Sequence, residues 1–268
     1  MALSLGERAS FAGMQKPRAI YPYLSPALPR IFAHRGLAIE PGVFENTIPA
    51  FRAALLAGAT HLETDVQVTK DEIPVLFHDD DLNRVIGLPR KVSELTFAEL
   101  SAAAQHAMVE IPTLRRALTE LPETRFNLDL KVAAAIAPTA ALINELDAAG
   151  RILVTSFSES RRARTVMAID ESVASSAGGL RVLALRLAAA CRLKFAIVIL
   201  ARPIQAIQIP VRQGPIRFDS PSFIRQMTAA GLELHYWTIN DAAEMRRLIA
   251  LGAHGIVTDR TDIAVNTL

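Results

Sequence analysis

The sequence predicts a single (β/α)8 TIM barrel of the α/β class, and three observations lead to this prediction. The chain has 268 residues, of which 51% are hydrophobic, enough for one large core. From residue 30 onward, short apolar or β-branched runs alternate eight times with helical patterns, as expected of a parallel sheet. Polar side chains interrupt two of these runs, at the place where barrel enzymes carry their active sites. A closed barrel accounts for all three better than an open sheet.

The eight expected strands are short and regularly spaced. They cover residues 31–34, 62–66, 126–130, 152–155, 173–175, 206–209, 233–237 and 255–257. A ninth run, residues 74–77, follows the second strand after the turn-like sequence Thr69-Lys70-Asp71-Glu72. This spacing predicts a β-hairpin extension after strand 2.

Helix-ending signals separate the strands. Residues 48–57 predict a helix with Asn46 or Thr47 as its N-cap, Pro49 in its first turn and Gly58 beyond its end. Residues 183–200 form the most hydrophobic segment, but they include three cations that would be costly at a bilayer centre. We therefore expect a buried helix followed by a strand here, and no integral membrane segment.

The chain divides into an N-terminal arm, residues 1–29, and one barrel domain, residues 30–268. Charges interrupt the first thirty residues, so no secretory signal is expected. Prolines between residues 22 and 29 predict an extended arm, laid over the surface or left mobile. The only cysteine, Cys191, cannot form an intrachain disulfide, which suits a reducing compartment. We expect a cytoplasmic protein.

The charge balance bears on possible partners. The chain has 29 Lys and Arg against 27 Asp and Glu, a net charge of +2. This small excess argues against nucleic acid as a partner and leaves a small molecule as the expected one. The run Arg161, Arg162 and Arg164 is expected to form a solvated helix face. The oligomeric state is not predicted.

Carboxylates lie where buried barrel strands should be apolar. Glu63 and Asp65 are two residues apart, so they point the same way, and so do Asp129 and Lys131 on the next barrel strand. Their apolar neighbours must face the helices. A cluster of oxygen ligands without thiolates favours Mg²⁺ or Ca²⁺. The alternative is a structural ion-pair network of Lys131 with Asp129 and Glu63.

Two histidines follow strand ends. His34 precedes Arg35 and Gly36, and an imidazole and a guanidinium beside a glycine that admits a ligand suit an anion such as phosphate. His78 follows the hairpin strand, and two histidines at one rim could divide acid and base duties.

The remaining histidines have simpler interpretations. His61 is expected at the start of its strand, away from the rim, and His235 in the core or just behind the site. His106 and His254 are expected to face solvent.

The ordered motifs together resemble the glycerophosphodiester phosphodiesterase family. They are His34-Arg35-Gly36, Glu45-Asn46-Thr47, Glu63-x-Asp65, His78-Asp79, Asp129-x-Lys131, Ser156-Phe157, Trp237-Thr238-Ile239-Asn240 and the segment from Gly255 to Asp259. The resemblance implies a (β/α)8 barrel that hydrolyses glycerol phosphodiesters to glycerol 3-phosphate and an alcohol, with one divalent cation, Mg²⁺ or Ca²⁺.

The resemblance also implies roles for individual residues. His34 and His78 would be the catalytic acid/base pair. Glu63, Asp65 and Asp129 would be the metal ligands. Arg35 and Lys131 would contact the phosphate, Glu45 would support the site and Trp237 would line the substrate pocket.

The chain departs from the family pattern in two places. Many members have Glu where Asp129 stands, and the shorter side chain loses about 1.5 Å of reach, so ligation through water is an alternative. The connection after the His-Asp motif, residues 80–109, is moderate in length, whereas many members insert a larger segment.

Two rival functions remain open. One is a lysophospholipase D acting on long-chain lysophospholipids, which would need an apolar groove at the rim. The sequence reveals no such groove, so lysophospholipids are expected to be poorer substrates than soluble diesters. The other is a catalytically silent barrel that binds a phosphoryl ligand.

Overall fold

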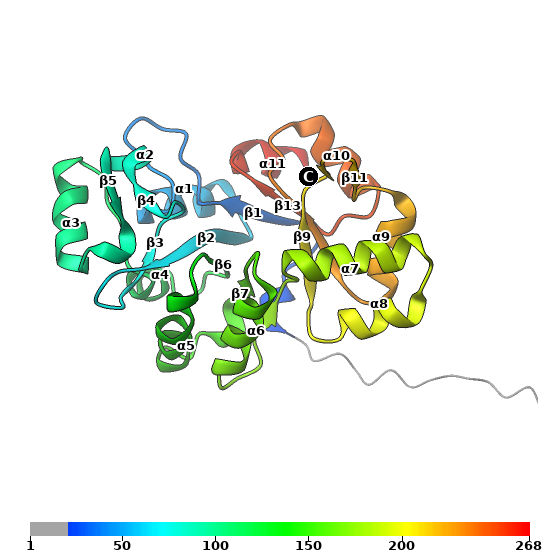
Figure 1. The fold of residues 1–268 in the computed structure, drawn as a ribbon. Helices are drawn as coiled ribbons and strands as arrows, with labels where there is room; N and C mark the ends of the chain where they lie inside the picture. Colours follow the sequence, from blue (N-terminus) through cyan, green and yellow to red (C-terminus); the bar gives the residue numbers. More distant parts are fainter. Residues whose placement is uncertain (1–20) are drawn as a thin grey trace, which may run out of the picture.

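The computed structural model describes residues 21–268, and in them eight parallel strands form a barrel (Figure 1). The barrel strands are β1 (Arg30–His34), β2 (His61–Val68), β6 (Phe126–Leu130), β7 (Ile152–Thr155), β8 (Ala174–Ser175), β9 (Ala206–Ile209), β12 (Glu233–Tyr236) and β13 (Gly255–Thr258). Neighbours in the barrel are neighbours in the sequence. The ring closes between β8 and β9, where Gln205 N donates to Ser175 O at 2.9 Å. The predicted (β/α)8 barrel is confirmed.

The predicted hairpin is present after the second barrel strand. Strand β3 (Pro74–Leu76) pairs antiparallel with β2, with Val66 opposite Leu76. Residues 80–109 then form a small lobe at the left of Figure 1. It contains β4 (Asp81–Leu82), α2 (Asn83–Ile86), β5 (Leu88–Lys91), a 3-10 turn (Val92–Glu94) and α3 (Phe97–His106). Leu82, Val92 and Leu100 give this lobe an apolar cluster of its own beside the barrel.

The other helices surround the barrel. They are α1 (Ile48–Ala57), α4 (Leu114–Glu120), α5 (Ile136–Glu145), α6 (Glu159–Ala168), α7 (Gly179–Ala190), α8 (Lys194–Ala201), α9 (Pro221–Ala229), α10 (Ala242–Ala250) and α11 (Thr261–Thr267). In α1 the N-cap is Thr47, whose hydroxyl accepts from Ala50 N, and Gly58 ends the helix in the left-handed region at φ 105°. Asn46, the other predicted cap, instead bonds Asp65.

Strand alternation separates two environments, as the sequence predicts. Leu62, Val66 and Leu128 point outward into the core shared with the helices. The alternate residues of the strands point into the barrel. Among them, Phe32, Leu153 and Val257 form an inner apolar layer. Because this layer fills the lower barrel, the polar side chains above it lie at the carboxyl ends of the strands.

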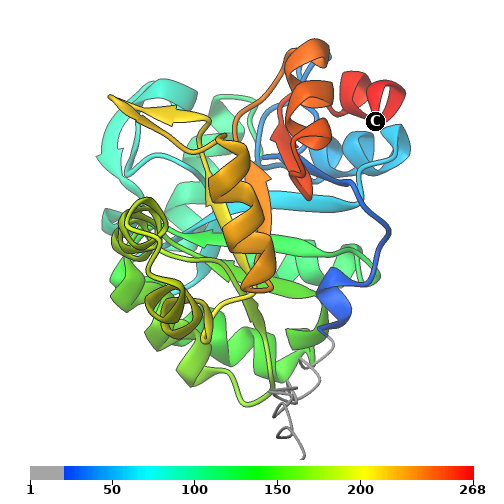
Figure 2. The same cartoon turned by 90° about the vertical axis from the view of Figure 1, so that its right-hand side faces the viewer.

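The segment 183–200 does not contain the expected strand. It forms α7 and α8, which lie side by side along one flank of the barrel (Figures 1 and 2). A short apolar run such as residues 195–200 fits a buried strand or a helix equally well by composition. The left-handed Arg192, at φ 57°, reverses the chain between the two helices. No helix among residues 21–268 is long and apolar enough to cross a membrane.

Residues 22–29 do not simply lie over the surface as predicted. A 3-10 turn (Pro22–Leu24) places Tyr23 inside the amino-terminal end of the barrel, where it is fully buried. Its ring packs edge-on against His61 at 4.7 Å between centroids, and His61 Nε2 bonds Tyr23 O at 3.0 Å. Residues 1–20 of the predicted arm lie outside the described residues.

Two surface predictions are also wrong. Arg162 is buried, because Glu159 pairs with its guanidinium at 2.7 Å and Ser175 Oγ accepts from it. Arg161 donates to Leu130 O at 2.7 Å, so of the three arginines only Arg164 is fully exposed. His254 is half-buried and accepts from Leu234 N, whereas His106 faces solvent as predicted.

Candidate active site

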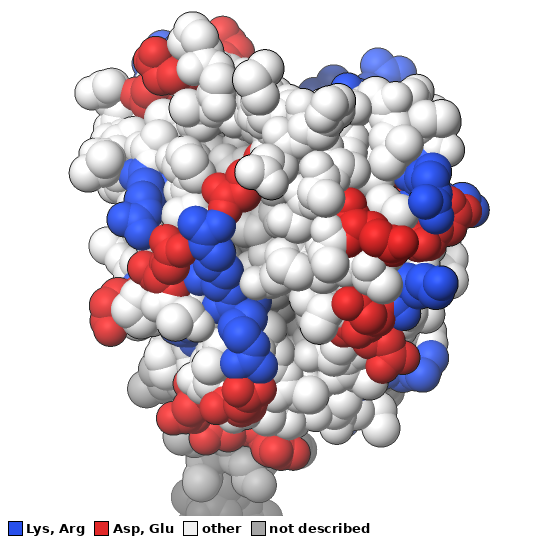
Figure 3. Space-filling model, turned by 90° about the vertical axis from the view of Figure 1, so that its left-hand side faces the viewer, with Lys and Arg blue, Asp and Glu red and all other residues white. Residues whose placement is uncertain are grey.

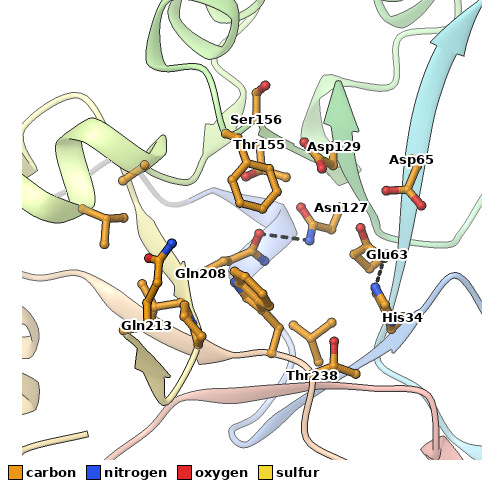
Figure 4. Close-up of a pocket in the computed structure, with 18 of the residues that line it drawn as sticks. His34, Glu63, Asp65, Asn127, Asp129, Thr155, Ser156, Gln208, Gln213 and Thr238 are labelled. Carbon is orange, nitrogen blue, oxygen red and sulfur yellow. Dashed lines mark hydrogen bonds and ion pairs between the residues drawn. The ribbon is translucent and has the colours of Figure 1, made fainter. Parts of the chain in front are cut away.

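The polar strand ends surround one pocket of about 540 Å³ at the carboxyl end of the barrel (Figure 4). Eight of the nine residues expected in the site line it: His34, Arg35, Glu63, Asp65, His78, Asp129, Lys131 and Trp237. Glu45, expected to support the site, lies behind Arg35. The structure therefore brings together, from four barrel strands and the hairpin, side chains that are far apart in the sequence.

Lys131 occupies the space between two of the carboxylates. Its Nζ lies 2.7 Å from Asp65 Oδ1 and 2.7 Å from Asp129 Oδ2. Burial lowers the pKa of Lys131, but the two carboxylates outweigh it, and the pKa is raised above its usual value. For Asp65, burial is outweighed by Lys131 and Arg35, so its pKa falls. Lys131 and Asp65 are thus held charged in a buried setting.

Glu63 lies in a different electrostatic environment on the same strand. Burial, and then the charge of Asp65, raise the pKa of Glu63 to about 8. Its Oε2 accepts from Arg35 N at 3.2 Å and lies 3.9 Å from His34 Nε2, the contact drawn in Figure 4. A buried carboxylate without a close cationic partner favours its neutral form unless a positive charge approaches.

Arg35 connects the carboxylates to the rim. Its Nε lies 3.1 Å from Asp65 Oδ2 and its Nη1 lies 3.1 Å from Glu45 Oε1. Glu45 also accepts from Arg84 at 2.6 Å. The guanidinium is therefore oriented from both sides, and Glu45 supports it.

Gly36 does not serve the purpose expected from the sequence. A Cβ at this position, at φ 87°, would lie 2.8 Å from backbone and side-chain atoms of Ala50. The glycine therefore lets α1 approach the end of β1 closely, rather than admitting a ligand.

Each of the two site histidines has a carboxylate partner on Nδ1. His34 Nδ1 lies 2.6 Å from Asp259 Oδ1, and His78 Nδ1 lies 2.6 Å from Asp79 Oδ1. Because a carboxylate accepts, the proton resides on Nδ1 in the neutral rings and Nε2 remains free to exchange a proton. Burial lowers the pKa of His34, but Asp259 and Glu63 outweigh it and raise the pKa overall.

Two buried oxygens of residues that line the site have no hydrogen-bond partner within residues 21–268. They are Asp129 Oδ1 and Asn127 Oδ1. The side-chain nitrogen of Asn127 donates to Gln208 Oε1 at 3.1 Å. Figure 4 shows Asn127 and Asp129 on β6 facing the same space as Glu63 and Asp65 on β2. In this part of the chain, however, no three His, Cys, Asp or Glu side chains are arranged to hold a metal ion. Lys131 separates two of the predicted ligands.

The other wall of the pocket is apolar, which the sequence did not reveal. Its lining includes Val182 and Leu183 of α7 together with Ile216 and Phe218. Trp237 stands at the rim with its ring 6.0 Å from that of Phe157, edge-on. The sequence alone does not locate this apolar wall, because only the closed barrel places α7 beside the rim.

Sequence reasoning gave no role to several residues that the structure places in the site. Asp259 and Asp79 were noted only within motifs, and Asn46 only within a motif and as a possible helix cap, yet each bonds a site side chain. Asn127 lies two residues before Asp129 on the same strand, so this spacing already indicates that both side chains face the barrel interior. Gln208 lies on a strand that appears apolar, and only the closure of the barrel places it opposite Asn127.

Comparison with known proteins agrees with this geometry. Residues 34–263 match the model of the glycerophosphoryl diester phosphodiesterase family. The chain belongs to this family. It is accordingly a phosphoric diester hydrolase, a glycerophosphodiester phosphodiesterase.

Similar proteins cover nearly the whole chain. A probable glycerophosphodiester phosphodiesterase 2 of Mycobacterium tuberculosis is 36% identical over 236 residues, 88% of this chain and 89% of that protein. A rat lysophospholipase D is 26% identical over 279 residues, 87% and 83% of the two chains.

Solved structures show the same fold. A glycerophosphodiester phosphodiesterase of Thermotoga maritima has a TM-score of 0.70 at 20% identity, covering 90% of this chain and 98% of that one. An Oleispira antarctica phosphodiesterase in complex with the product sn-glycerol-3-phosphate has a TM-score of 0.71 at 24% identity, covering 90% and 96%.

Proposed function

We propose that this enzyme hydrolyses glycerophosphodiesters to glycerol 3-phosphate and an alcohol, with His34 and His78 as the acid/base pair and one divalent cation. The observation that carries the proposal is that both histidines line one pocket with three carboxylates and two cations. The names of the similar proteins support the substrate class.

The cations of the pocket suit the charge of a phosphodiester. Arg35 and Lys131 are both held in place by carboxylates, so neither needs to be ordered when the substrate binds. Phosphodiester cleavage increases the negative charge on the phosphoryl oxygens, and two fixed cations beside them lower the barrier. Trp237 would line the pocket wall against the substrate.

The donor set fits a hard divalent cation, Mg²⁺ or Ca²⁺. Asp129 has an unpartnered buried oxygen, and burial raises the pKa of Glu63, as expected where a compensating positive charge is missing. Glu63, Asp65 and Asp129 would hold the ion, and the oxygen of Asn127 is a further possible donor. A bound cation would supply Lewis-acid stabilisation of the phosphoryl charge.

The two histidines would handle the protons. His34, held by Asp259, would take a proton at Nε2 either from the attacking water or from the glycerol hydroxyl. In the second case the product of the first step is a cyclic phosphate, which water would then open to glycerol 3-phosphate. His78, held by Asp79, would deliver a proton from Nε2 to the departing alcohol oxygen as its bond to phosphorus breaks.

The products distinguish this reaction from the alternative cleavage of the same diester. With glycerophosphocholine and Mg²⁺ or Ca²⁺, phosphorus NMR should show glycerol 3-phosphate, and choline should appear in equal amount. Phosphocholine and glycerol as products, or an unchanged substrate with every divalent cation tested, would contradict the proposal.

A second candidate substrate class is favoured by one observation, the apolar wall formed by Val182, Leu183 and Phe218. Such a wall could receive the acyl chain of a lysophospholipid, and a similar rat protein is named lysophospholipase D. Competition between lysophosphatidylcholine and glycerophosphocholine separates the classes. A value of kcat/KM more than about tenfold higher for the long-chain compound would establish it as the preferred substrate.

A further inference from the structure

The outward face of α7 and α8 is apolar and has no covering element in the described structure. Leu180, Leu183 and Leu187 recur at intervals of three and four residues, which places them on one face of α7. Leu180 is 78% exposed and Leu187 is 59% exposed. On α8, Phe195 is 78% exposed, and Val198 and Ile199 are exposed beside it.

The opposite sides of both helices are buried in the same core. Val182, Leu185 and Ala188 of α7 and Ile197 and Ala201 of α8 all belong to one apolar cluster. The exposed side chains therefore point away from the barrel. We define the α7–α8 face by its exposed apolar residues: Leu180, Leu183, Leu187, Leu193, Phe195, Val198 and Ile199.

The charged side chains of the segment that forms this face are all positive, and two of them are ion-paired with neighbouring carboxylates: Arg181 with Glu159 and Arg217 with Asp219. Residues 172–218 contain seven cations and no Asp or Glu. The cations are Arg181, Arg186, Arg192, Lys194, Arg202, Arg212 and Arg217. Arg192, in the turn between the helices, and Lys194, the first residue of α8, are exposed and flank Leu193. On the flank that carries α3 and β5, by contrast, Lys and Arg are interspersed with Asp and Glu (Figure 3).

The α7–α8 face continues into the active-site pocket. Leu183 belongs both to the exposed stripe and to the pocket lining, and Val182 next to it lines the same wall. Phe157, which is 66% exposed, continues the apolar rim beside Trp237. A surface that covers the α7–α8 face would therefore meet the mouth of the pocket.

We propose that the α7–α8 face docks on an anionic phospholipid surface. Leucine and phenylalanine side chains would enter the boundary between head groups and acyl chains, while Arg192 and Lys194 would lie among anionic head groups. Docked in this way, the enzyme would present its pocket to lipid-borne phosphodiesters. That consequence for substrates rests on the proposed function, but the docking itself does not.

The single sign of the charge favours a lipid surface over a second copy of the chain. Pairing two copies through the same face would bring the cations of residues 172–218 of one copy next to those of the other, without acidic partners from this segment. An anionic membrane would supply opposite charge to the exposed cations of this segment that have no carboxylate partner among residues 21–268, Arg192 and Lys194 among them.

Vesicle flotation of the full-length protein tests the docking. We expect the enzyme to float with vesicles of phosphatidylglycerol and phosphatidylcholine, and to bind pure phosphatidylcholine vesicles at least about tenfold more weakly. Leu187→Gln with Phe195→Gln should lower the vesicle-bound fraction by at least about tenfold. Arg192→Gln with Lys194→Gln should lower it in a salt-dependent way.

Leu56→Gln is the matched control, because Leu56 is an exposed leucine on α1, away from the α7–α8 face. None of these residues lines the pocket, so glycerophosphocholine turnover should be unchanged in every variant and reports correct folding. Lack of vesicle binding by the wild type would overturn the proposal. Equal vesicle binding by wild type and Leu187→Gln/Phe195→Gln would overturn it too. So would a wild-type dimer in solution that becomes a monomer in Leu187→Gln/Phe195→Gln. A failure of turnover alone would affect the proposed function and leave the docking result intact.

Discussion

His34 Nδ1 lies 2.6 Å from Asp259 Oδ1, although 225 positions separate the two residues. The contact joins the end of β1 to the residue that follows β13, the neighbouring strand in the barrel. The other oxygen of Asp259 accepts from Asn240 Nδ2 at 2.8 Å. Asp259 is therefore fixed from the far side, and it fixes the orientation and the tautomer of His34.

Asp259→Asn should lower kcat on the order of 10²-fold with little change in KM. The new amide oxygen would accept from Asn240, leaving the amide nitrogen to donate to His34 Nδ1. The proton of His34 would then reside on Nε2, so this atom could no longer accept one. Steady-state kinetics with glycerophosphocholine measure the effect.

Asp262→Asn provides the control for this substitution. Asp262 is three residues away and pairs with Arg260 rather than with a site residue. It should leave kcat unchanged. Equal rates for wild type and Asp259→Asn would show that Asp259 does not position His34.

Metal dependence gives a second prediction, centred on Glu63. Exhaustive chelation should abolish turnover, and added Mg²⁺ or Ca²⁺ should restore it. Glu63→Gln should bind the ion more weakly in titration calorimetry and need much more metal for the same rate, whereas exposed Glu171→Gln should match the wild type. Full activity after chelation would contradict the metal dependence. The contacts of Lys131 with Asp65 and Asp129 would then be a purely structural ion-pair network.

Tyr23 should contribute to stability without contributing to catalysis. Its ring is fully buried beside His61 and Phe32 at the amino-terminal end of the barrel. Tyr23→Ala should lower the free energy of unfolding by about 3 to 5 kcal/mol, because it leaves a cavity. Tyr23→Phe keeps the ring and should cost much less. Urea unfolding measures both, and similar losses in the two variants would contradict this role.

Acid should destabilise the protein through its buried histidines. Burial lowers the pKa of His61 to about 3 and also lowers that of His235, so both are neutral in the folded protein. The unfolded chain binds protons below pH 6.5, and the stability gained from neutral His61 is lost as the pH falls from 6.5 toward 3. The free energy of unfolding should drop by about 2 kcal/mol from pH 7 to pH 5 for His61 alone.

Unfolding of wild type and His61→Gln at several pH values checks this effect. The variant should show a weaker dependence between pH 7 and pH 5, with the contribution of His235 remaining. A wild-type stability that is flat over this interval would contradict the assignment of buried neutral histidines.

The barrel could be predicted because its signals are local. A two-residue polar alternation in residues 61–65 and 127–131 fixes which side chains face the interior, independently of any tertiary contact. The caps at Thr47 and Gly58 likewise act within one turn of the chain. Such features are encoded in short windows of sequence.

The errors share a different physical cause, since each depends on a distant partner. Residues 195–200 form a helix rather than a strand because α8 packs against α7 and buries Ile197 and Ala201 in the shared core. Arg162 is buried because Glu159 and Ser175 satisfy its donors, and Ser175 lies on another element. Tyr23 enters the barrel because His61 and Phe32 leave room for a ring between strands.

The same distinction explains the site. The residue types at positions 34, 63, 65, 78, 129 and 131 indicate a cation site, an anion site and an acid/base pair from short motifs, and the family resemblance implies the phosphodiester reaction. Two contacts could not be predicted without knowing which strands are neighbours. One places Lys131 between Asp65 and Asp129, and the other pairs His34 with Asp259. Likewise, the apolar wall appeared only once α7 was placed beside the rim.

Turnover of glycerophosphocholine by His34→Ala and His78→Ala tests the central claim most directly. If the two histidines share the acid/base work, each substitution should lower kcat on the order of 10²- to 10⁴-fold, while circular dichroism and urea unfolding show an intact fold. His106→Ala, which changes a solvent-facing histidine, should retain the wild-type rate. Near-normal turnover by both His34→Ala and His78→Ala would contradict the account.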